Sequence, residues 1–146
     1  MRALFALYPA LGRQRERPSF GQFAEGYFLN RQSMDYYDQA YAADRADWRS
    51  VPGDGELAGL PPTLVATASL DPLRDDGRAF AARLVEAGVP VTFWEAEGNI
   101  HGFAVFRRVI ASSNGDLAHI LSLLSAMLGT DGDSARLTSS ERLSLP

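Results

Sequence analysis

Three short stretches of the chain are mostly apolar and carry no charged residue, and proline or glycine lies beside each of them. A strand that is covered on both faces loses its polar alternation, so these stretches predict buried strands. They cover residues 3–8, 63–69 and 89–94. Residues 75–87 repeat apolar side chains at helical spacing and end at Gly88, which predicts a helix between the second and third strands.

This order of strand, helix and strand predicts a βαβ unit with parallel strands and a right-handed connection. Parallel strands end at the same edge of their sheet, so the residues that follow the second and third strands are expected to lie close together. Asp71 follows the second strand, and His101 falls in a loop predicted over residues 95–102. Open α/β sheets build their binding sites at this edge.

The rest of the N-terminal half is predicted to form loops and short helices. Residues 10–22 are polar and contain proline and glycine, which indicates a loop. Two short aromatic-rich helices are predicted over residues 23–29 and 33–41, the second with Ser33 as its N-cap. Residues 42–62 are rich in proline, glycine and aspartate and are predicted to form a turn-rich connection.

A strongly apolar helix is predicted over residues 116–128. Its buried stripe is expected to consist of leucine and isoleucine side chains at helical spacing: Leu117, Ile120, Leu121, Leu124 and Leu128. His119 falls on the polar side of this helix and is expected at the surface. Residues 129–146 are rich in Ser, Thr, Asp and Gly, which predicts a disordered tail.

Composition indicates a globular protein of one modest domain, with 146 residues of which 46% are hydrophobic. The formal net charge of −4, without clustered Lys and Arg, argues against a nucleic-acid partner. The N-terminal apolar run is too short for a signal peptide, and no run reaches the roughly 18 apolar residues of a membrane span. The absence of cysteine excludes disulfides and thiolate metal sites and fits a reducing compartment, so a cytoplasmic location is expected.

Asp71 and His101 are the candidate catalytic residues. A carboxylate beside a histidine fixes the imidazole tautomer and stabilises the imidazolium that forms when the ring takes a proton from serine. The order of acid and then histidine matches the α/β-hydrolases, in which serine precedes both. Taken singly, Asp71 is more typical of a turn or helix cap, and His101 of an ordinary loop residue. Their joint position at consecutive strand ends favours the catalytic interpretation.

Several segments of the chain carry a family resemblance: Leu7-Tyr8-Pro9, Pro61-Pro62-Thr63-Leu64-Val65, Leu70-Asp71-Pro72-Leu73-Arg74-Asp75, Leu84-Val85-Glu86-Ala87-Gly88-Val89-Pro90 and Ile100-His101-Gly102-Phe103. Together they closely resemble the C-terminal half of the hormone-sensitive-lipase family of α/β-hydrolase esterases, from about residue 3 to about residue 108. The resemblance implies that Asp71 is the triad acid and His101 the triad base. It also implies short to medium acyl esters as substrates, with no metal and no organic cofactor.

The chain departs from this family at the nucleophile. The family's serine lies in a G-D-S-A-G-type elbow and its oxyanion donors in an H-G-G-G-type loop, and neither motif occurs among the 146 residues. The expected fold class is α/β, the C-terminal portion of an α/β-hydrolase fold with about three parallel strands, flanking helices and part of a cap. Residues 1–128 would form this partial domain, with residues 19–45 as a cap-like helical insertion.

The chain is therefore expected to be the C-terminal part of a serine ester hydrolase that is inactive alone and acts on a small-molecule ester once an N-terminal half completes it. The alternatives are a non-enzymatic interaction half-domain and one chain of a split esterase. The first strand would leave an edge without a neighbour, which predicts self-association or poor solubility.

The cap-like segment supplies the candidate substrate-binding residues Phe28, Met34 and Tyr37, because this family carries part of its cap over the acyl pocket. An alternative explanation is at least as well supported by the sequence. Met34, Tyr37 and Tyr41 have helical spacing, so they would simply form one packing face of a helix.

Overall fold

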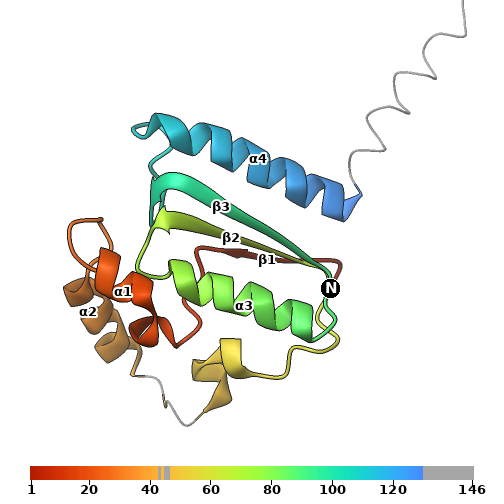
Figure 1. Cartoon of the computed structure of the whole chain (residues 1–146), viewed down its shortest axis with the longest axis horizontal. Coiled ribbons are helices and arrows are strands. Elements are labelled where there is room, and N and C mark those ends of the chain that lie inside the picture. Colours follow the sequence, from red (N-terminus) through yellow and green to blue (C-terminus); the bar gives the residue numbers. More distant parts are fainter. Residues whose placement is uncertain (43, 45–46, 130–146) are drawn as a thin grey trace, which may run out of the picture.

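The computed structural model describes residues 1–42, 44 and 47–129. Within these residues, one parallel sheet has three strands in the order β1 (Leu4–Leu7), β2 (Thr63–Leu70) and β3 (Val91–Ile100). Helix α3 (Arg74–Glu86) covers one face of the sheet and α4 (Ala111–Leu128) covers the other (Figure 1). The predicted α/β architecture with parallel strands is confirmed.

Strand β2 is the centre of the fold because it pairs with β1 on one side and with β3 on the other. Its residues are buried from Thr63 to Ser69. Alternation along the strand sends Leu64 to one face, where it packs with Ile120 of α4. Val65 points to the other face and packs with Phe80 of α3. This burial on both faces explains why β2 contains no charged residue, and why only small hydroxyl side chains interrupt its apolar sequence.

Helix α1 (Pro18–Phe23) lies beside the carboxyl ends of the strands, next to α2 (Arg31–Tyr41) (Figure 1). The buried Ser19 attaches α1 to the start of α3. Its hydroxyl donates to the carbonyl of Pro72 over 2.9 Å, and its backbone N–H donates to Asp75 Oδ2 over 2.9 Å. The two short helices are therefore held at the edge of the sheet where β2 and β3 end.

The structure corrects the predicted boundaries of these short helices. The helix predicted over residues 23–29 is instead α1, which begins inside the predicted loop because Pro18 occupies the first turn, where its fixed φ is favourable. Helix α2 is capped by Asn30, whose side chain accepts from the Ser33 backbone N–H over 2.8 Å. Ser33 is therefore not the cap.

Strand β3 continues to Ile100, so the loop predicted over residues 95–102 is wrong for most of its length. The polar residues that suggested a loop have partners in the folded protein. Glu95 pairs with Arg78 over 2.6 Å and Asn99 binds Asp116 over 2.7 Å, so the ladder with β2 continues through a bulge near Ser69. Tertiary partners here override a polar local sequence.

Helix α4 begins at Ala111, earlier than the predicted residue 116, and its buried face is rotated from the predicted stripe. Leu121 was expected in the stripe but is 51% exposed, while Leu123 and Met127 pack against the core. Most of the predicted tail lies outside the described residues. None of the described helices is both long and apolar enough to cross a membrane.

Gly77 sets the distance between α3 and the sheet. A Cβ atom at this position would lie 2.5 Å from Cγ2 of Thr67 and 3.6 Å from Pro9 Cδ. Thr67 is a buried, β-branched residue of the central strand, so its methyl group cannot move aside easily. The missing side chain therefore permits the close packing of α3 on β2.

Gly77→Ala is expected to lower the free energy of unfolding by about 1 to 3 kcal/mol, because the added methyl overpacks the contact with Thr67. The matched control is Gly115→Ala in α4, where a Cβ meets nothing within 4 Å. That variant should be neutral or more stable by up to about 1 kcal/mol, since alanine favours helix. Urea denaturation measures both, and equal effects of the two substitutions would contradict this role of Gly77.

Candidate functional site

Asp71 and His101 meet at the carboxyl edge of the sheet. Asp71 directly follows β2 and His101 directly follows β3, and these strands are paired neighbours. Asp71 Oδ2 lies 2.8 Å from His101 Nδ1, which is hydrogen-bond distance. The side chain of Asp71 is 1% exposed and that of His101 is 22% exposed. The carboxylate is thus enclosed while the imidazole keeps access to the surface.

The second carboxylate oxygen of Asp71 accepts the backbone N–H of Leu73 over 2.8 Å. Asp71 therefore does form the turn that the sequence suggested, and it contacts His101 at the same time. The turn fixes the carboxylate, so its other oxygen has a defined direction toward the ring. The two explanations of Asp71 that the sequence offered are compatible.

This arrangement suits the imidazole to act as a base. A proton on Nδ1 is held by the carboxylate, which leaves Nε2 with its lone pair to accept a proton from a hydroxyl. Once Nε2 is protonated, the buried Asp71 stabilises the imidazolium. Acid–base chemistry of this kind requires only the two side chains and a hydroxyl placed within reach of Nε2.

Tyr8 lies against the same imidazole and was not identified as a site residue from the sequence. Its ring centroid is 4.7 Å from that of His101, with the planes at 60°. The ring also meets Phe103 edge to face, with centroids 5.7 Å apart. Burial, followed by the nearby charge of Asp71, raises the pKa of the Tyr8 phenol above its usual value of 10.0. Tyr8 is therefore neutral at physiological pH.

A pocket of about 420 Å³ opens beside His101. It is lined by residues of the β1 end, the following loop, α2 and the start of α3: Leu7, Tyr8, Pro9, Ala10, Gln14, Leu29, Met34, Tyr37, Asp38, Leu73 and His101. Most of these side chains are apolar. The pocket is thus suited to a small, largely apolar molecule next to the imidazole.

Two of the three predicted substrate-binding residues line this pocket. Met34 is buried and Tyr37 is 60% exposed, and both line the pocket with His101. Phe28 does not line it and packs on Phe106, with ring centroids 4.7 Å apart. The packing-face alternative is wrong for the tyrosines, because Tyr37 and Tyr41 are both exposed while Met34 is buried.

Gln14 is a polar pocket residue that sequence analysis missed. The side chain is buried, and its Oε1 finds no hydrogen-bond partner within the part of the chain that the structure describes. The residue lies in a 3₁₀ helix, Gln14–Glu16, inside the segment that was predicted to be a polar loop. A glutamine in a polar segment is usually exposed, so the sequence contained no signal of its burial.

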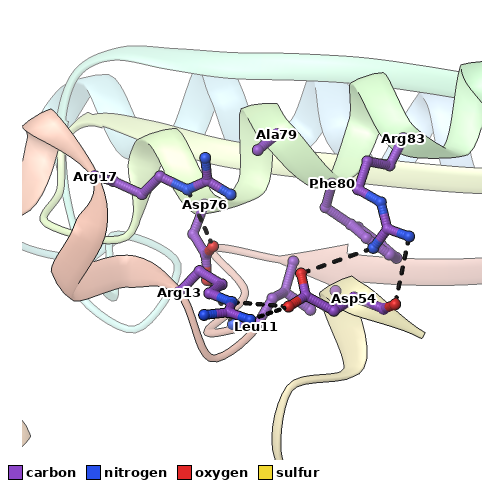
Figure 2. A pocket seen from close by; sticks show the side chains of 9 residues that line it. Leu11, Arg13, Arg17, Asp54, Asp76, Ala79, Phe80 and Arg83 are labelled. Carbon is purple, nitrogen blue, oxygen red and sulfur yellow. Dashed lines mark hydrogen bonds and ion pairs between the residues drawn. The ribbon is translucent and has the colours of Figure 1, made fainter. Parts of the chain in front are cut away.

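A buried carboxylate holds the loop that carries Gln14. Asp76 of α3 is 3% exposed, and its Oδ2 accepts the Leu11 backbone N–H over 2.8 Å. Its Oδ1 lies 3.7 Å from Arg17 Nε, and nearby Arg13 pairs with Asp54 over 2.6 Å (Figure 2). The cavity among these side chains measures about 10 Å³, room for about one water molecule. This cluster is therefore a support for the pocket wall.

A second polar cluster supports the end of β3. Asn99 is fully buried and donates to Asp116 Oδ2 over 2.7 Å, while its carbonyl oxygen accepts from Ser113 over 2.9 Å. Trp94 Nε1 donates to the other Asp116 oxygen over 2.9 Å. These bonds tie the start of α4 to the strand that ends just before His101. The only sign of this cluster in the sequence was a polar residue, Asn99, in a segment where polar and apolar residues alternate poorly.

Two further predictions concern single side chains. Ser69 was expected to pack, and it is buried with its hydroxyl accepting the Gly98 backbone N–H over 2.8 Å. His119 lies at the surface as expected, and its ring rests against Trp94 at a centroid distance of 4.1 Å.

The described residues contain no cluster of three or more His, Cys, Asp or Glu suited to a metal ion.

Comparison with known protein families matches residues 1–105 to a family described as alpha/beta hydrolase fold. The chain is 34% identical over 122 residues to ethyl acetate hydrolase of Pseudomonas putida, covering 81% of this chain and 38% of that protein. It is 34% identical over 113 residues to carboxylesterase NlhH of Mycobacterium tuberculosis, covering 73% and 35%. The chain therefore spans less than two fifths of the length of these relatives.

Solved structures agree with this match. Ester-hydrolase EH1AB1 from the metagenome of Lake Arreo superposes with a TM-score of 0.79 at 36% identity, over 88% of this chain and 42% of that one. A hyperthermophilic esterase from the archaeon Pyrobaculum calidifontis superposes with a TM-score of 0.78 at 26% identity, over 86% and 43%. Both superpositions cover most of this chain and less than half of the other.

Asp76 makes stability depend on pH with a definite sign. Burial raises its pKa above the ordinary 3.8, so the folded protein binds this proton more tightly than the unfolded chain does. The stabilisation that comes from this tighter proton binding is fully present below the pKa of Asp76 in the unfolded chain. It is lost as the pH rises through the pKa of Asp76 in the folded protein. Relative to Asp76→Asn, the wild type should therefore lose free energy of unfolding as the pH rises above about 4.

Urea denaturation between pH 3.5 and 7 measures this difference. Asp47→Asn is the control with the opposite sign, because hydrogen bonds from Arg49 lower the pKa of Asp47. Its small contribution should be lost as the pH falls. A wild-type advantage over Asp76→Asn that stays constant with pH would show that the carboxyl of Asp76 is not perturbed by burial.

Proposed function

This chain belongs to the alpha/beta hydrolase fold family, and from that premise we propose that it is the C-terminal part of a serine ester hydrolase. In this proposal Asp71 is the triad acid and His101 the triad base. The observation that carries the proposal is the 2.8 Å contact between their side chains at the ends of adjacent parallel strands. The esterases and hydrolases among its relatives support ester bonds as the target.

The proposed reaction begins when His101 Nε2 takes the proton of a serine hydroxyl as its oxygen attacks the ester carbonyl. The resulting imidazolium, paired with Asp71, then returns a proton to the leaving alcohol. Water repeats the sequence on the acyl-enzyme, releasing the acid and regenerating serine. Each step moves one proton through His101, and no metal or organic cofactor is needed.

The serine and the oxyanion donors are proposed to come from a segment that carries the G-x-S-x-G elbow. One oxyanion donor is worth about 3 to 4 kcal/mol of transition-state stabilisation, so a polypeptide without elbow and donors should not hydrolyse esters efficiently. We propose a small-molecule ester of short to medium acyl length as substrate. Residues 19–45 act as a cap-like element, with Met34 and Tyr37 beside the substrate.

The free side of β1 supports a partner in this assembly. Among the described residues β1 pairs only with β2, and its four residues are half-buried. Such an edge can take a further strand from an elbow-bearing segment or from a second copy. In a split esterase that segment is a separate polypeptide, whereas in the alternative of a non-enzymatic interaction half-domain the edge docks on another partner. The lack of cysteine supports a cytoplasmic setting.

The activity test combines this chain with the elbow-bearing segment of a related esterase and follows p-nitrophenyl acetate hydrolysis. His101→Ala and Asp71→Asn should each lower kcat/KM by about 10⁴-fold, because the base or its orienting carboxylate is lost. His119→Ala is the matched control and should leave the rate unchanged, since this exposed histidine lies on α4. Circular dichroism checks that each variant is folded. Undiminished hydrolysis by either site variant would remove that residue from the triad.

The open edge of β1 predicts self-association of the chain by itself. Sedimentation velocity at increasing concentration should show oligomers that grow with concentration, because unpaired strand edges associate. Adding the elbow-bearing segment should replace these oligomers with a one-to-one complex. A chain that stays monomeric at every concentration and melts cooperatively would contradict this prediction.

A further inference from the structure

The Asp71 bond leaves the orientation of the His101 imidazole incompletely determined. A single hydrogen bond at Nδ1 fixes one atom of the ring, and the ring can still tilt about that contact. The imidazole is 22% exposed, so the protein does not enclose it on every side. A base that must accept a proton at Nε2 needs a second contact to set the direction of that nitrogen.

The second contact is the ring of Tyr8. We propose that Tyr8 is a positioning residue, whose aromatic ring holds the His101 imidazole in line with Asp71. The inference rests on the proposed function of His101 as base. The centroids lie 4.7 Å apart at an interplanar angle of 60°, which is the edge-to-face arrangement that aromatic pairs favour. Tyr8 contacts the base and takes no part in proton transfer in this proposal.

The backbone of Tyr8 is built to present the ring. Its φ is 36°, in the left-handed region that a tyrosine rarely adopts. The backbone N–H donates to Ala66 of the central strand over 2.6 Å, and the following Pro9 packs where Gly77 of α3 leaves space. A strained conformation persists only when its surroundings determine it, and such strain concentrates at functional sites. Here it turns the side chain from the end of β1 toward His101.

A second aromatic ring also contacts Tyr8. Phe103, which is fully buried, meets it edge to face at 5.7 Å. The Tyr8 ring therefore contacts both the buried core and the imidazole. Gly102 lies between His101 and Phe103 in the chain and has a φ of 78°. This left-handed conformation, which glycine adopts readily, allows the turn that brings both rings to the same tyrosine.

The ring, and not the hydroxyl, carries the proposed role. Burial and the charge of Asp71 keep the phenol protonated, so it adds no negative charge beside the imidazolium. An edge-to-face contact needs only the aromatic ring. Tyr8→Phe keeps the aromatic ring and should therefore preserve the positioning of the imidazole. Tyr8→Leu keeps an apolar side chain but lacks the aromatic ring, so the positioning should be lost.

The test uses nuclear magnetic resonance of the ¹⁵N-labelled chain, which has two histidines. The ¹⁵N shifts of each imidazole report its tautomer, and the Nδ1–H signal of His101 reports the bond to Asp71. Wild type and Tyr8→Phe should show one tautomer for His101 with a slowly exchanging Nδ1 proton. In Tyr8→Leu, exchange of that proton should be about threefold to tenfold faster, as expected for loss of an aromatic pair.

His119 is the internal control, and its signals should be unchanged in every variant. Exchange in Tyr8→Leu as slow as in Tyr8→Phe would overturn the positioning role, since a side chain that only packs the core would give this result. A nuclear Overhauser contact between Tyr8 ring protons and His101 Hε1 in the wild type tests the geometry without any substitution. Its absence would also overturn the inference, even if Tyr8→Leu fails to fold.

Asp71→Asn separates this inference from the proposed function. If the Nδ1–H signal is lost in Asp71→Asn but Tyr8→Leu has no effect, the proposed Asp71–His101 pair stands. Only the positioning role of Tyr8 is then refuted. If the wild type shows no such signal, the pair itself is absent in solution and both proposals fail. The expected result is loss of the signal in Asp71→Asn, faster exchange of the Nδ1 proton in Tyr8→Leu, and no change in Tyr8→Phe.

Discussion

The parallel pairing of β2 with β3 is the constraint on which the candidate site depends. Both strands end at the same edge, so Asp71 and His101 come within hydrogen-bond distance although 30 positions separate them in the chain. The pairing is stable because β2 is buried on both faces, by α3 on one side and by α4 on the other. A shift of the register by one residue would invert every side chain of β3 relative to the core and would separate the pair.

The close packing of α3 on the sheet extends this control to the wall of the pocket. Gly77 lets Thr67 and Pro9 approach the helix, and Pro9 follows the strained Tyr8. Asp76, the residue before Gly77 in the same helix, holds the loop after Pro9 through the backbone N–H of Leu11. The imidazole, the tyrosine beside it and the loop that lines the pocket thus depend on one helix–sheet contact. Stability and site geometry are coupled at this point.

Sequence patterns were reliable where one local rule determined the structure. Apolar runs identified the three strands, and the segment after β2 identified the turn at Asp71, because these features require only burial or a preferred turn residue. They failed where polar groups find distant partners. Glu95 and Asn99 suggested a loop, yet Arg78 and Asp116 satisfy them within the fold, so β3 continues. Gln14 looked like a surface residue and is buried.

The sequence by itself determined the α/β class, the parallel order of the strands and the two side chains that meet at their ends. These follow from hydrophobic periodicity, from the short connections and from motifs within a few residues of one another. Only the tertiary structure decided that Tyr8 lies on His101, that Met34 and Tyr37 face its pocket while Phe28 does not, and how far β3 extends. Those features depend on contacts between segments far apart in the chain, whose distance and orientation are set by packing and leave no local pattern.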